Sequence, residues 1–348
     1  MAYTTINKST DHFNTVTYTG NGSVGTALTT GTFQPDLTWF KNRGTTESHM
    51  WMDAVRGATN YIQSNSTAAQ GTSSDKISAF TSTGVTLGSG AETNENSQPL
   101  VCWSWKAGTG QGSSNTDGSI NTTYTSANTT SGFSISSYTG TGSNATIGHG
   151  LGVKPSMIIC KKLNTTGSWI TYHSALGATK YLYLNATDAE AANSTVWQDT
   201  EPTTPVFSVG SASNCNDSGA TYVAYCFAEK KGFSKFGSYV GSGNANGPFV
   251  YTGFKPAFFL WKRHNSTGGW YIADNKRSPF NLVDIILGPN DSNKESAFGT
   301  VQNFDFCSNG IKLRGTNVDS NYDGGQYIYI AFAEAPLVSS NGVPATAR

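Results

Sequence analysis

The strongest constraint on this chain is a short pattern that occurs three times with the same internal spacing. Each copy has a tyrosine at the start of a Tyr-x-Gly-x-Gly motif, a proline 17 residues after that tyrosine, and a lysine six residues after the proline. The three sets are Tyr18, Pro35 and Lys41; Tyr138, Pro155 and Lys161; and Tyr239, Pro256 and Lys262. Two spacings kept in three places indicate three diverged copies of one unit of about one hundred residues.

Each copy has the residue pattern of short strands joined by turns. An apolar run follows each proline, and a second apolar run closes the copy at 101–105, 222–227 and 327–332. A run that is apolar at successive positions predicts a central strand covered on both faces. Tyr, Phe, Trp and Thr favour strands, while Gly, Asn and Ser supply turns. We therefore predict an all-β chain of three tandem antiparallel β-sandwich units, of jelly-roll or concanavalin-like type.

A tryptophan also recurs 14 to 16 residues after the proline of each copy, at Trp51, Trp169 and Trp270. A large aromatic side chain that recurs in every unit more often packs a sandwich core than binds a ligand. We predict that these three tryptophans are equivalent core residues.

The same pattern predicts the domain boundaries. Units are expected at 1–106, 132–232 and 233–336, with an extended C-terminal tail at 337–348 that docks on a neighbour. Residues 107–131 are almost all Gly, Ser, Thr, Asn and Asp, a composition typical of a linker. The second and third units follow each other without a spacer, so we expect them to pack together and the first unit to be more independent.

Charge and hydropathy exclude several classes of function. The chain has 22 Lys and Arg against 22 Asp and Glu, so its formal net charge is zero and no basic patch predicts a nucleic-acid partner. No apolar stretch reaches the length of a membrane-spanning helix, so no membrane insertion is expected. The N-terminus lacks the pattern of a secretory signal, which predicts synthesis in the cytoplasm. The five cysteines form no CxxC pair, so a structural metal is not expected.

Motifs for catalysis are not evident, and we predict that the chain is not an enzyme. Binding of a sugar is the alternative that the aromatic and amide residues favour, because sugar rings stack on aromatic side chains and hydroxyls pair with polar ones. Trp197 does not belong to the repeat and is predicted to be exposed. His173 and Asp199 are the polar residues predicted to act beside it. A β-sandwich glycosidase would instead need two carboxylates roughly 5 to 10 Å apart.

One segment has the start of a calcium-binding loop. Asp319, Asn321 and Asp323 follow the D-x-N-x-D-G order, but Ile330 stands where such a loop needs a bidentate Glu. The alternative is an ordinary turn before the closing strand. Calcium at these three residues is the only cofactor that the sequence suggests.

Several motifs resemble virion proteins of marine tailed bacteriophages. They are the repeated Tyr-x-Gly-x-Gly pattern, GHGLGVKP at 148–155, YCFAEKKGF at 225–233 and GFKP at 253–256. The likeness extends over the whole chain. It implies SPRY-like or concanavalin-like β-sandwich units, labelled tail-fibre or structural proteins, and no established catalytic residues.

The resemblance predicts a protein of the virion surface, synthesised in the host cytoplasm. Its leading role would be attachment to the host as part of a tail fibre or spike, with possible binding of a host cell-surface glycan. A capsid decoration or cement protein is the alternative of the same class, and a glycan depolymerase on a β-sandwich scaffold is the alternative of another class. The expected partners are other virion proteins and copies of the same chain.

Overall fold

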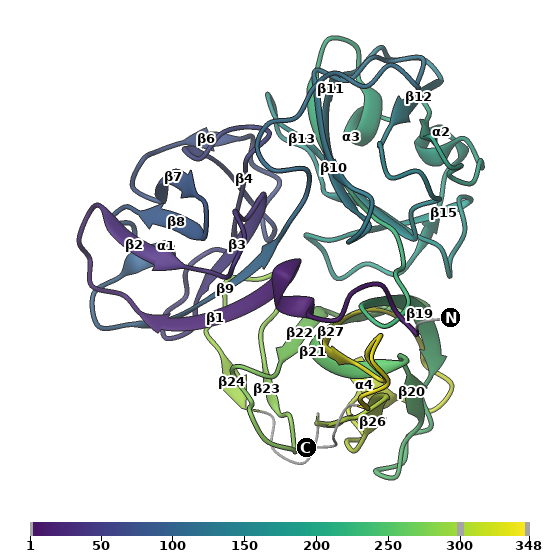
Figure 1. Ribbon diagram of the computed structural model, residues 1–348. Helices are drawn as coiled ribbons and strands as arrows, with labels where there is room; N and C mark the ends of the chain where they lie inside the picture. Colours follow the sequence, from purple (N-terminus) through teal and green to yellow (C-terminus); the bar gives the residue numbers. More distant parts are fainter. Residues whose placement is uncertain (1–2, 298–302, 345–348) are drawn as a thin grey trace.

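The computed structural model describes residues 3–297 and 303–344 of the chain. Within these residues the regular structure is almost entirely antiparallel strand, and each helix is a single turn. The predicted all-β class is confirmed. Three groups of sheets surround a common centre (Figure 1), and we call them unit 1 (residues 3–106), unit 2 (107–232) and unit 3 (233–336).

Unit 1 is a sandwich of a six-stranded and a three-stranded sheet. Its elements are η1 (Ser9–Asp11), β1 (Phe13–Thr19), β2 (Thr26–Thr29), β3 (Leu37–Asn42), β4 (Met50–Asp53), β5 (Asn60–Gln63), β6 (Gly71–Thr72), β7 (Ile77–Thr81), β8 (Gly84–Leu87), α1 (Ala91–Asn94) and β9 (Pro99–Trp105). The large sheet has the order β1-β9-β3-β4-β5-β6 and the small sheet the order β2-β8-β7.

Unit 2 repeats this arrangement with one additional edge strand. Its elements are β10 (Tyr124–Asn128), β11 (Phe133–Thr139), β12 (Ala145–Gly148), β13 (Met157–Lys162), β14 (Ile170–His173), β15 (Lys180–Tyr183), β16 (Ala191–Ala192), α2 (Ser194–Trp197), β17 (Val206–Val209), α3 (Ser213–Asn216) and β18 (Thr221–Phe227). The large sheet has the order β10-β11-β18-β13-β14-β15-β16, and β12 pairs with β17.

Unit 3 has the same central strands and shorter peripheral ones. Its elements are β19 (Ser234–Val240), β20 (Phe249–Tyr251), β21 (Phe254–Arg263), β22 (Trp270–Asp274), β23 (Ile285–Ile286), β24 (Ser296–Ala297), β25 (Phe304–Cys307), β26 (Gly310–Leu313), α4 (Val318–Asn321) and β27 (Gln326–Pro336). The sheets have the orders β19-β27-β21-β22, β20-β26-β25 and β23-β24.

The strand register is the same at the centre of each large sheet. The second residue after each repeated proline pairs with an aromatic residue near the end of the closing strand and with the last residue of the next strand. These sets are Leu37 with Trp105 and Asp53, Met157 with Phe227 and His173, and Phe258 with Phe332 and Asp274. This register sets which residues correspond between units in the description below.

The strand after each proline is buried on both faces, as the sequence predicts, but two different layers cover it. In β13, Ile158 and Cys160 face the small sheet of their own unit. Met157 and Ile159 face a core shared with the other two units. The strands β3 and β21 divide their side chains in the same way. Each large sheet is therefore the middle layer between its own small sheet and its neighbours.

Aromatic side chains at three corresponding positions meet at the centre of the molecule. The ring centroids of Trp105, Phe227 and Phe332 lie 6.4 Å (Trp105–Phe227), 5.8 Å (Trp105–Phe332) and 6.2 Å (Phe227–Phe332) apart. Each unit thus contributes one side to a closed triangle of edge-to-face contacts, a geometry that aromatic pairs prefer. The expectation that unit 1 is more independent is wrong, because its core is continuous with that of both other units.

The repeated Tyr-x-Gly-x-Gly motif fixes a loop against the single-turn helix of its own unit. A Cβ atom on its first glycine would lie 2.1 to 2.4 Å from a backbone oxygen at the end of that helix, so no other residue fits at Gly20, Gly140 or Gly241. The second glycine has a positive φ in all three copies. The tyrosine hydroxyls donate to helix carbonyls, for example Tyr138 to Cys215 at 2.7 Å. The motif is therefore structural.

Residues 107–131, expected to be a linker, are held to both neighbouring units. The Asp36 carboxylate accepts hydrogen bonds from the backbone N–H groups of Ala107, Thr109 and Gly110 at 2.7 to 3.0 Å. Further along, β10 (residues 124–128) joins the large sheet of unit 2 as its edge strand. Carboxylate capping and edge pairing satisfy the backbone of a segment that has little apolar surface of its own.

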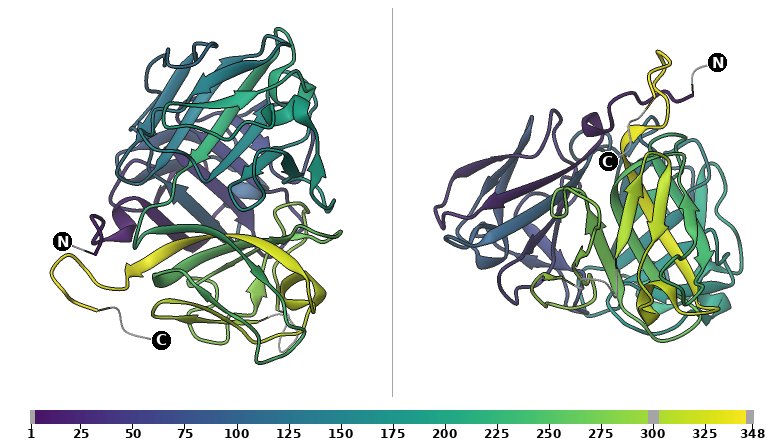
Figure 2. Two further views of the ribbon diagram at one scale, coloured as in Figure 1. Left: turned by 90° about the vertical axis from the view of Figure 1, so that its right-hand side faces the viewer. Right: turned by 90° about the horizontal axis from the view of Figure 1, so that it is seen from below.

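The C-terminal tail turns back on itself within the described residues. Val338 and Pro344 form an antiparallel bridge, and the Ser340 N–H donates to Asn7 Oδ1 at 2.7 Å. The tail and the N-terminal segment therefore run along the same side of the molecule (Figure 2). The prediction that 337–348 docks on a neighbouring chain stays a prediction, and its last four residues lie outside the described part.

Candidate functional site: the seams between units

The three units meet at three seams that share one backbone pattern. We call the contact between units 1 and 2 the first seam, that between units 2 and 3 the second, and that between units 3 and 1 the third. One backbone hydrogen bond recurs in each: Gln70 N–H to Leu163 O (2.8 Å), Glu190 N–H to His264 O (2.8 Å), and Glu295 N–H to Arg43 O (3.0 Å). Because the same bond joins each unit to the next, the three units form a closed ring.

An aromatic side chain at one position reaches across each seam, and this position corrects the sequence alignment. The backbone N–H groups of His49, Trp169 and Trp270 donate to Asn65, Asn185 and Asn290 respectively. Trp51, two residues further on, is therefore not the counterpart of Trp169 and Trp270, although it is a core residue as predicted. The spacing of 14 residues from proline to tryptophan, which is the same for Trp169 and Trp270, falls on His49 in unit 1, whereas Trp51 lies 16 residues after Pro35.

The cross-seam contacts of this position run in one direction around the ring. The Trp169 Nε1–H donates to Gln63 O of unit 1, and the Trp270 Nε1–H donates to Tyr183 O of unit 2, both at 2.9 Å. His49 lies in the same way against the backbone of Gly288 in unit 3, and burial lowers its pKa well below the usual value. Unit 1 thus uses a neutral imidazole where the other units use an indole.

Two of the three repeated lysines also donate across the seams. Lys161 Nζ donates to Thr67 O of unit 1 at 3.4 Å, and Lys262 Nζ donates to Thr187 O of unit 2 at 3.1 Å. Burial lowers the pKa of Lys41, Lys161 and Lys262 to about 8. Each ammonium group also bonds a backbone carbonyl of its own unit, Asn42 O, Lys162 O or Gly268 O respectively. Lys41 donates within unit 1, to Asn42 O and Thr45 O, so the hydrogen bond across the seam is made by Lys161 and Lys262.

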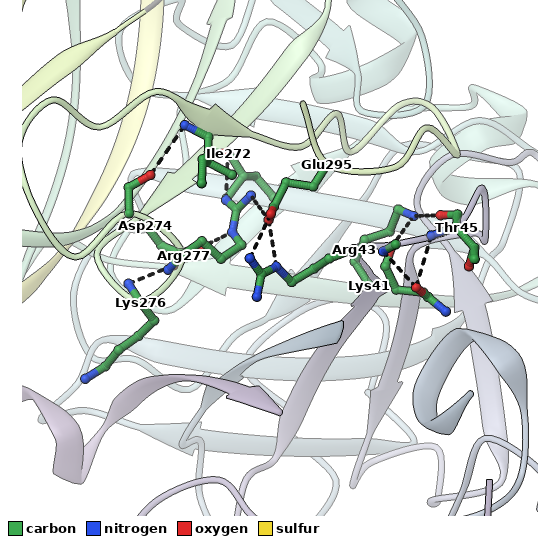
Figure 3. A network of polar contacts seen from close by, with 12 residues as sticks. Lys41, Arg43, Thr45, Ile272, Asp274, Lys276, Arg277 and Glu295 are labelled. Atoms are coloured by element: carbon green, nitrogen blue, oxygen red, sulfur yellow. Dashed lines mark hydrogen bonds and ion pairs between the residues drawn. The ribbon is translucent and has the colours of Figure 1, made fainter. Parts of the chain in front are cut away.

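The third seam is filled by an ion cluster (Figure 3). The Glu295 carboxylate of unit 3 accepts two hydrogen bonds from Arg43 of unit 1, each at 2.7 Å, and lies 3.4 Å from Arg277 of its own unit. Arg277 also pairs with Asp274 at 2.6 Å, and both of these side chains are fully buried. Burial alone would lower the pKa of Arg43, but the Glu295 carboxylate reverses this effect and raises it. A bidentate pair of this kind combines strong hydrogen bonds with fixed geometry.

The second seam has a weaker version of the same contact. Glu190 corresponds to Glu295 and accepts a hydrogen bond from His264 Nδ1, which corresponds to Arg43, at 2.7 Å. Burial lowers the pKa of His264, and the neighbouring Glu190 offsets only part of that effect. The imidazole is therefore neutral at neutral pH, so this contact is a hydrogen bond to a carboxylate and not a permanent ion pair.

The first seam lacks this cluster and is open. Gln70 replaces the glutamate, and Leu163 replaces the arginine of the neighbouring unit. Arg56, the counterpart of Arg277, pairs with Asp53 at 2.6 Å and donates to Gln70 Oε1 at 3.1 Å. The result is a groove of about 270 Å³ at the outer end of the shared core. Its lining residues are Val55, Arg56, Gln70, Gln111, Thr123, Tyr124, Ser137, Tyr138, Leu163, Thr221 and Tyr222.

The groove combines an apolar wall with pre-positioned polar groups. Tyr124 on β10 is half-buried against the shared core, and Leu163 lies beside it at the end of β13. Gln111 is fixed by donating from Nε2 to Val55 O at 3.1 Å. Six of the lining residues carry Arg, Gln, Thr or Ser side chains, and the aromatic and aliphatic residues among them form the apolar part of the concave surface. We take this groove as the candidate functional site.

The structure does not support the predicted exposure of Trp197. This side chain ends the single-turn helix α2, is only 2% exposed, and packs between Tyr172 and Phe207 in the core of unit 2. The expectation of an exposed ring is wrong because the helical turn directs the indole inward, which the polar neighbours in the sequence did not indicate. Asp199, two residues later, is exposed with a φ of 48° and lies away from the groove.

His173 is buried in the second seam. Its Nε2 lies 3.2 Å from Tyr329 O of unit 3, and its Nδ1 accepts from the Ala175 N–H at 3.2 Å. The neutral ring satisfies both contacts, and burial lowers the pKa of His173 to about 4. In the strand register His173 corresponds to Asp53 and Asp274. Its role is to join units 2 and 3, and it forms no site with Trp197 and Asp199.

Two residues of the predicted calcium loop, Asn321 and Asp319, make hydrogen bonds within unit 3. The Asn321 amide donates to Asn244 O and Gly315 O, and its oxygen accepts from the Ser242 N–H. Asn94 and Asn216 make the same contacts in the other units. Asp319 accepts from the Tyr271 hydroxyl, while Asp323 is exposed. Within the described residues, no group of three His, Cys, Asp or Glu side chains is placed to hold a metal ion.

Sequence reasoning missed the groove because its residues come from distant segments. Val55, Gln70, Tyr124, Leu163 and Thr221 share no motif. A signal was present nonetheless: where the closing pairs of the other seams carry Glu with Arg or His, the first seam carries Gln with Leu. That signal is readable only once the register shows which residues correspond.

Comparison with known proteins places the chain in a family without assigning an activity. None of the helices in the described residues is long and apolar enough to cross a membrane. No curated protein matches the sequence. A family model described as a domain of unknown function, DUF7483, matches residues 8–336, which include all three units and their seams. The chain therefore belongs to the DUF7483 family.

Proposed function

We propose that this chain is a non-enzymatic component of a bacteriophage virion surface, in a tail fibre or spike that attaches to the host. The observation that carries the proposal is the closed ring of three sandwich units. Their cores are continuous and each seam is sealed by a recurring backbone bond. A single rigid body of this kind suits a particle exposed outside the cell, and the motifs that resemble tailed-phage virion proteins run through all three units.

The distribution of exposed apolar residues supports attachment to a larger assembly. Of the ten large apolar side chains that are exposed in the described part of the chain, seven lie in unit 3. They are Val240, Phe249, Tyr251, Phe280, Leu282, Val318 and Tyr322. Contact with a partner would remove the apolar surface of these side chains from water. Unit 3 is therefore the part proposed to contact other virion proteins or copies of the chain.

Localisation in the virion tests the proposal. Virions of the phage that encodes the chain would be purified, analysed by mass spectrometry for this protein, and imaged by cryo-electron microscopy, with antibody labelling of the chain. Density at the tail tip or along the fibres is the expected result. Density over the capsid lattice would instead assign a decoration role, and absence of the chain from purified virions would overturn both.

A further inference from the structure

We propose that the groove of the first seam binds one ring of a neutral saccharide. The groove is the one place where the ring of seams lacks its closing pair, and it is lined from both units. Its volume of about 270 Å³ lies just below the roughly 300 to 1,000 Å³ that is usual for small-molecule sites, so it suits a single ring and not an extended chain.

The charge of the groove favours a neutral ligand. Among the described residues, Arg56 is the only charged one that lines the groove. Its guanidinium pairs with the fully buried Asp53 carboxylate, so the pair has no formal net charge. Arg56 also donates to Trp51 O, Gln70 Oε1 and the Tyr225 hydroxyl. A guanidinium with this many partners is already neutralised and positioned, and it would gain little from an anionic ligand.

The polar groups of the groove match the hydroxyls of a sugar. The hydroxyls of Thr123, Ser137 and Thr221 make no hydrogen bond with the described residues, although all three residues line the groove. Gln70 uses its amide oxygen for Arg56, which leaves its amide nitrogen as a donor. Gln111 uses its nitrogen for Val55, which leaves its oxygen as an acceptor. The groove thus offers three hydroxyls, one amide donor and one amide acceptor. The two amide side chains are each fixed by a hydrogen bond within the protein.

The apolar wall supplies the other half of sugar recognition. Tyr124 and Leu163 pack against the shared core, so their positions are set before a ligand arrives. A pyranose has one face of C–H groups that can cover an aromatic ring while its edge hydroxyls meet polar side chains. This assignment gives the proposed attachment role a ligand class and rests on that role only for its biological meaning.

Binding by the purified full chain tests the inference. The probes are methyl α-D-glucoside, methyl α-D-mannoside, methyl β-D-galactoside and N-acetyl-D-glucosamine, with D-glucuronic acid and N-acetylneuraminic acid as charged comparators. Saturation-transfer NMR followed by titration is expected to show at least one neutral probe binding with a Kd of about 1 to 10 mM. Absence of binding by every neutral probe, or binding of the charged ones alone, overturns the proposal.

Variants locate the site. The double substitution Q70E/L163R copies the closing pair of the third seam into the groove and is expected to weaken binding at least tenfold. Tyr124→Ala, which removes the stacking wall without adding charge, is expected to have a similar effect. The control is Val24→Thr, an exposed position in unit 1 that is not part of the groove. Thermal unfolding of each variant confirms that it is folded, and unchanged binding by folded Q70E/L163R and Tyr124→Ala overturns the assignment.

The outcome separates this inference from the proposed function. A chain found in the virion that binds no neutral sugar would retain its structural role and lose the ligand. A chain that binds sugar in the groove but is absent from virions would retain the site and lose the proposed location.

Discussion

The first and third seams share the same backbone hydrogen bond, but their side chains form a groove in the first and an ion cluster in the third. In both, a backbone N–H at the edge of one unit bonds a carbonyl of the next, and an arginine paired with an aspartate three residues earlier stands behind it. In the third seam Glu295 then joins Arg277 to Arg43 across the boundary. In the first seam Gln70 and Leu163 leave the same place open as a groove.

This difference shows that one set of contacts holds the three units together and another set of side chains gives each seam its own chemistry. The ring is closed by backbone bonds and by aromatic packing at the centre, which all three seams share. The side chains at the outer end of each seam are then able to diverge without separating the units. An ion cluster at one seam and a groove at another are two uses of one scaffold position, which is a common basis for new sites on repeated folds.

The largest expected effect comes from breaking the third seam at Arg277. Arg277→Met leaves the Asp274 carboxylate buried without its cation and removes one partner of Glu295. Loss of one member of a buried ion pair costs about 3 to 5 kcal/mol. Urea unfolding should show this loss. Arg56→Met should cost less, because Gln70 carries no charge, and an equal or larger loss in Arg56→Met would contradict the asymmetry of the two seams.

Acid should weaken the second seam through His173. Its pKa of about 4 in the folded chain lies below the unfolded value of about 6.5, so the unfolded chain binds a proton that the folded chain does not as pH falls between these values. The free energy of unfolding should therefore fall with pH in that window, by about 3 kcal/mol for this residue. Urea unfolding between pH 7 and 4.5 should show a shallower decline for His173→Asn than for the wild type.

The remaining slope of His173→Asn provides an internal control. The pKa values of His12, His49, His149 and His264 are also lowered by burial, so they should continue to destabilise the fold at low pH. A pH profile identical to that of the wild type would show that His173 is not neutral in the folded chain.

Converting the third seam to the residues of the first should have a smaller cost. The substitutions R43L/E295Q remove a bidentate pair whose two side chains are 19% and 15% exposed. We expect a loss of about 1 to 3 kcal/mol, the range for hydrogen bonds between charged groups. A double-mutant cycle at low and high salt measures the coupling of the two residues. The exposed pair Lys154 and Glu201 serves as control, and the coupling energy between its two residues should be no more than about 1 kcal/mol.

The smallest effect is expected from the reverse exchange. Q70E/L163R places the closing pair of the third seam into the groove, where Arg56 already stands in the position of Arg277. We expect a gain of at most about 1 kcal/mol, because forming the pair costs side-chain entropy and desolvation. A rise in the thermal midpoint of a few degrees would support the correspondence of the seams, and a clear destabilisation would argue against it.

The fold class followed from local patterns, and the site did not. The runs after Pro35, Pro155 and Pro256 predicted strands covered on both faces, which is a property of each strand alone. The apparent equivalence of Trp51 with Trp169 failed because it matched the residue type and allowed the interval to vary, whereas the exact interval of 14 residues after the proline falls on His49. Trp197 failed for a related reason: polar neighbours in the chain do not reveal which side of a helical turn faces the core.

What the sequence determined by itself was the unit: a repeated sandwich whose central strands need cover on both sides, with a glycine motif that no other residue fits. Only the tertiary structure decided what supplies the second cover. Each large sheet buries its outer face against the two neighbouring units, because a strand that is apolar on both faces cannot be satisfied by its own small sheet. That closure brings Gln70 and Leu163 together, and so it also decided where the groove lies.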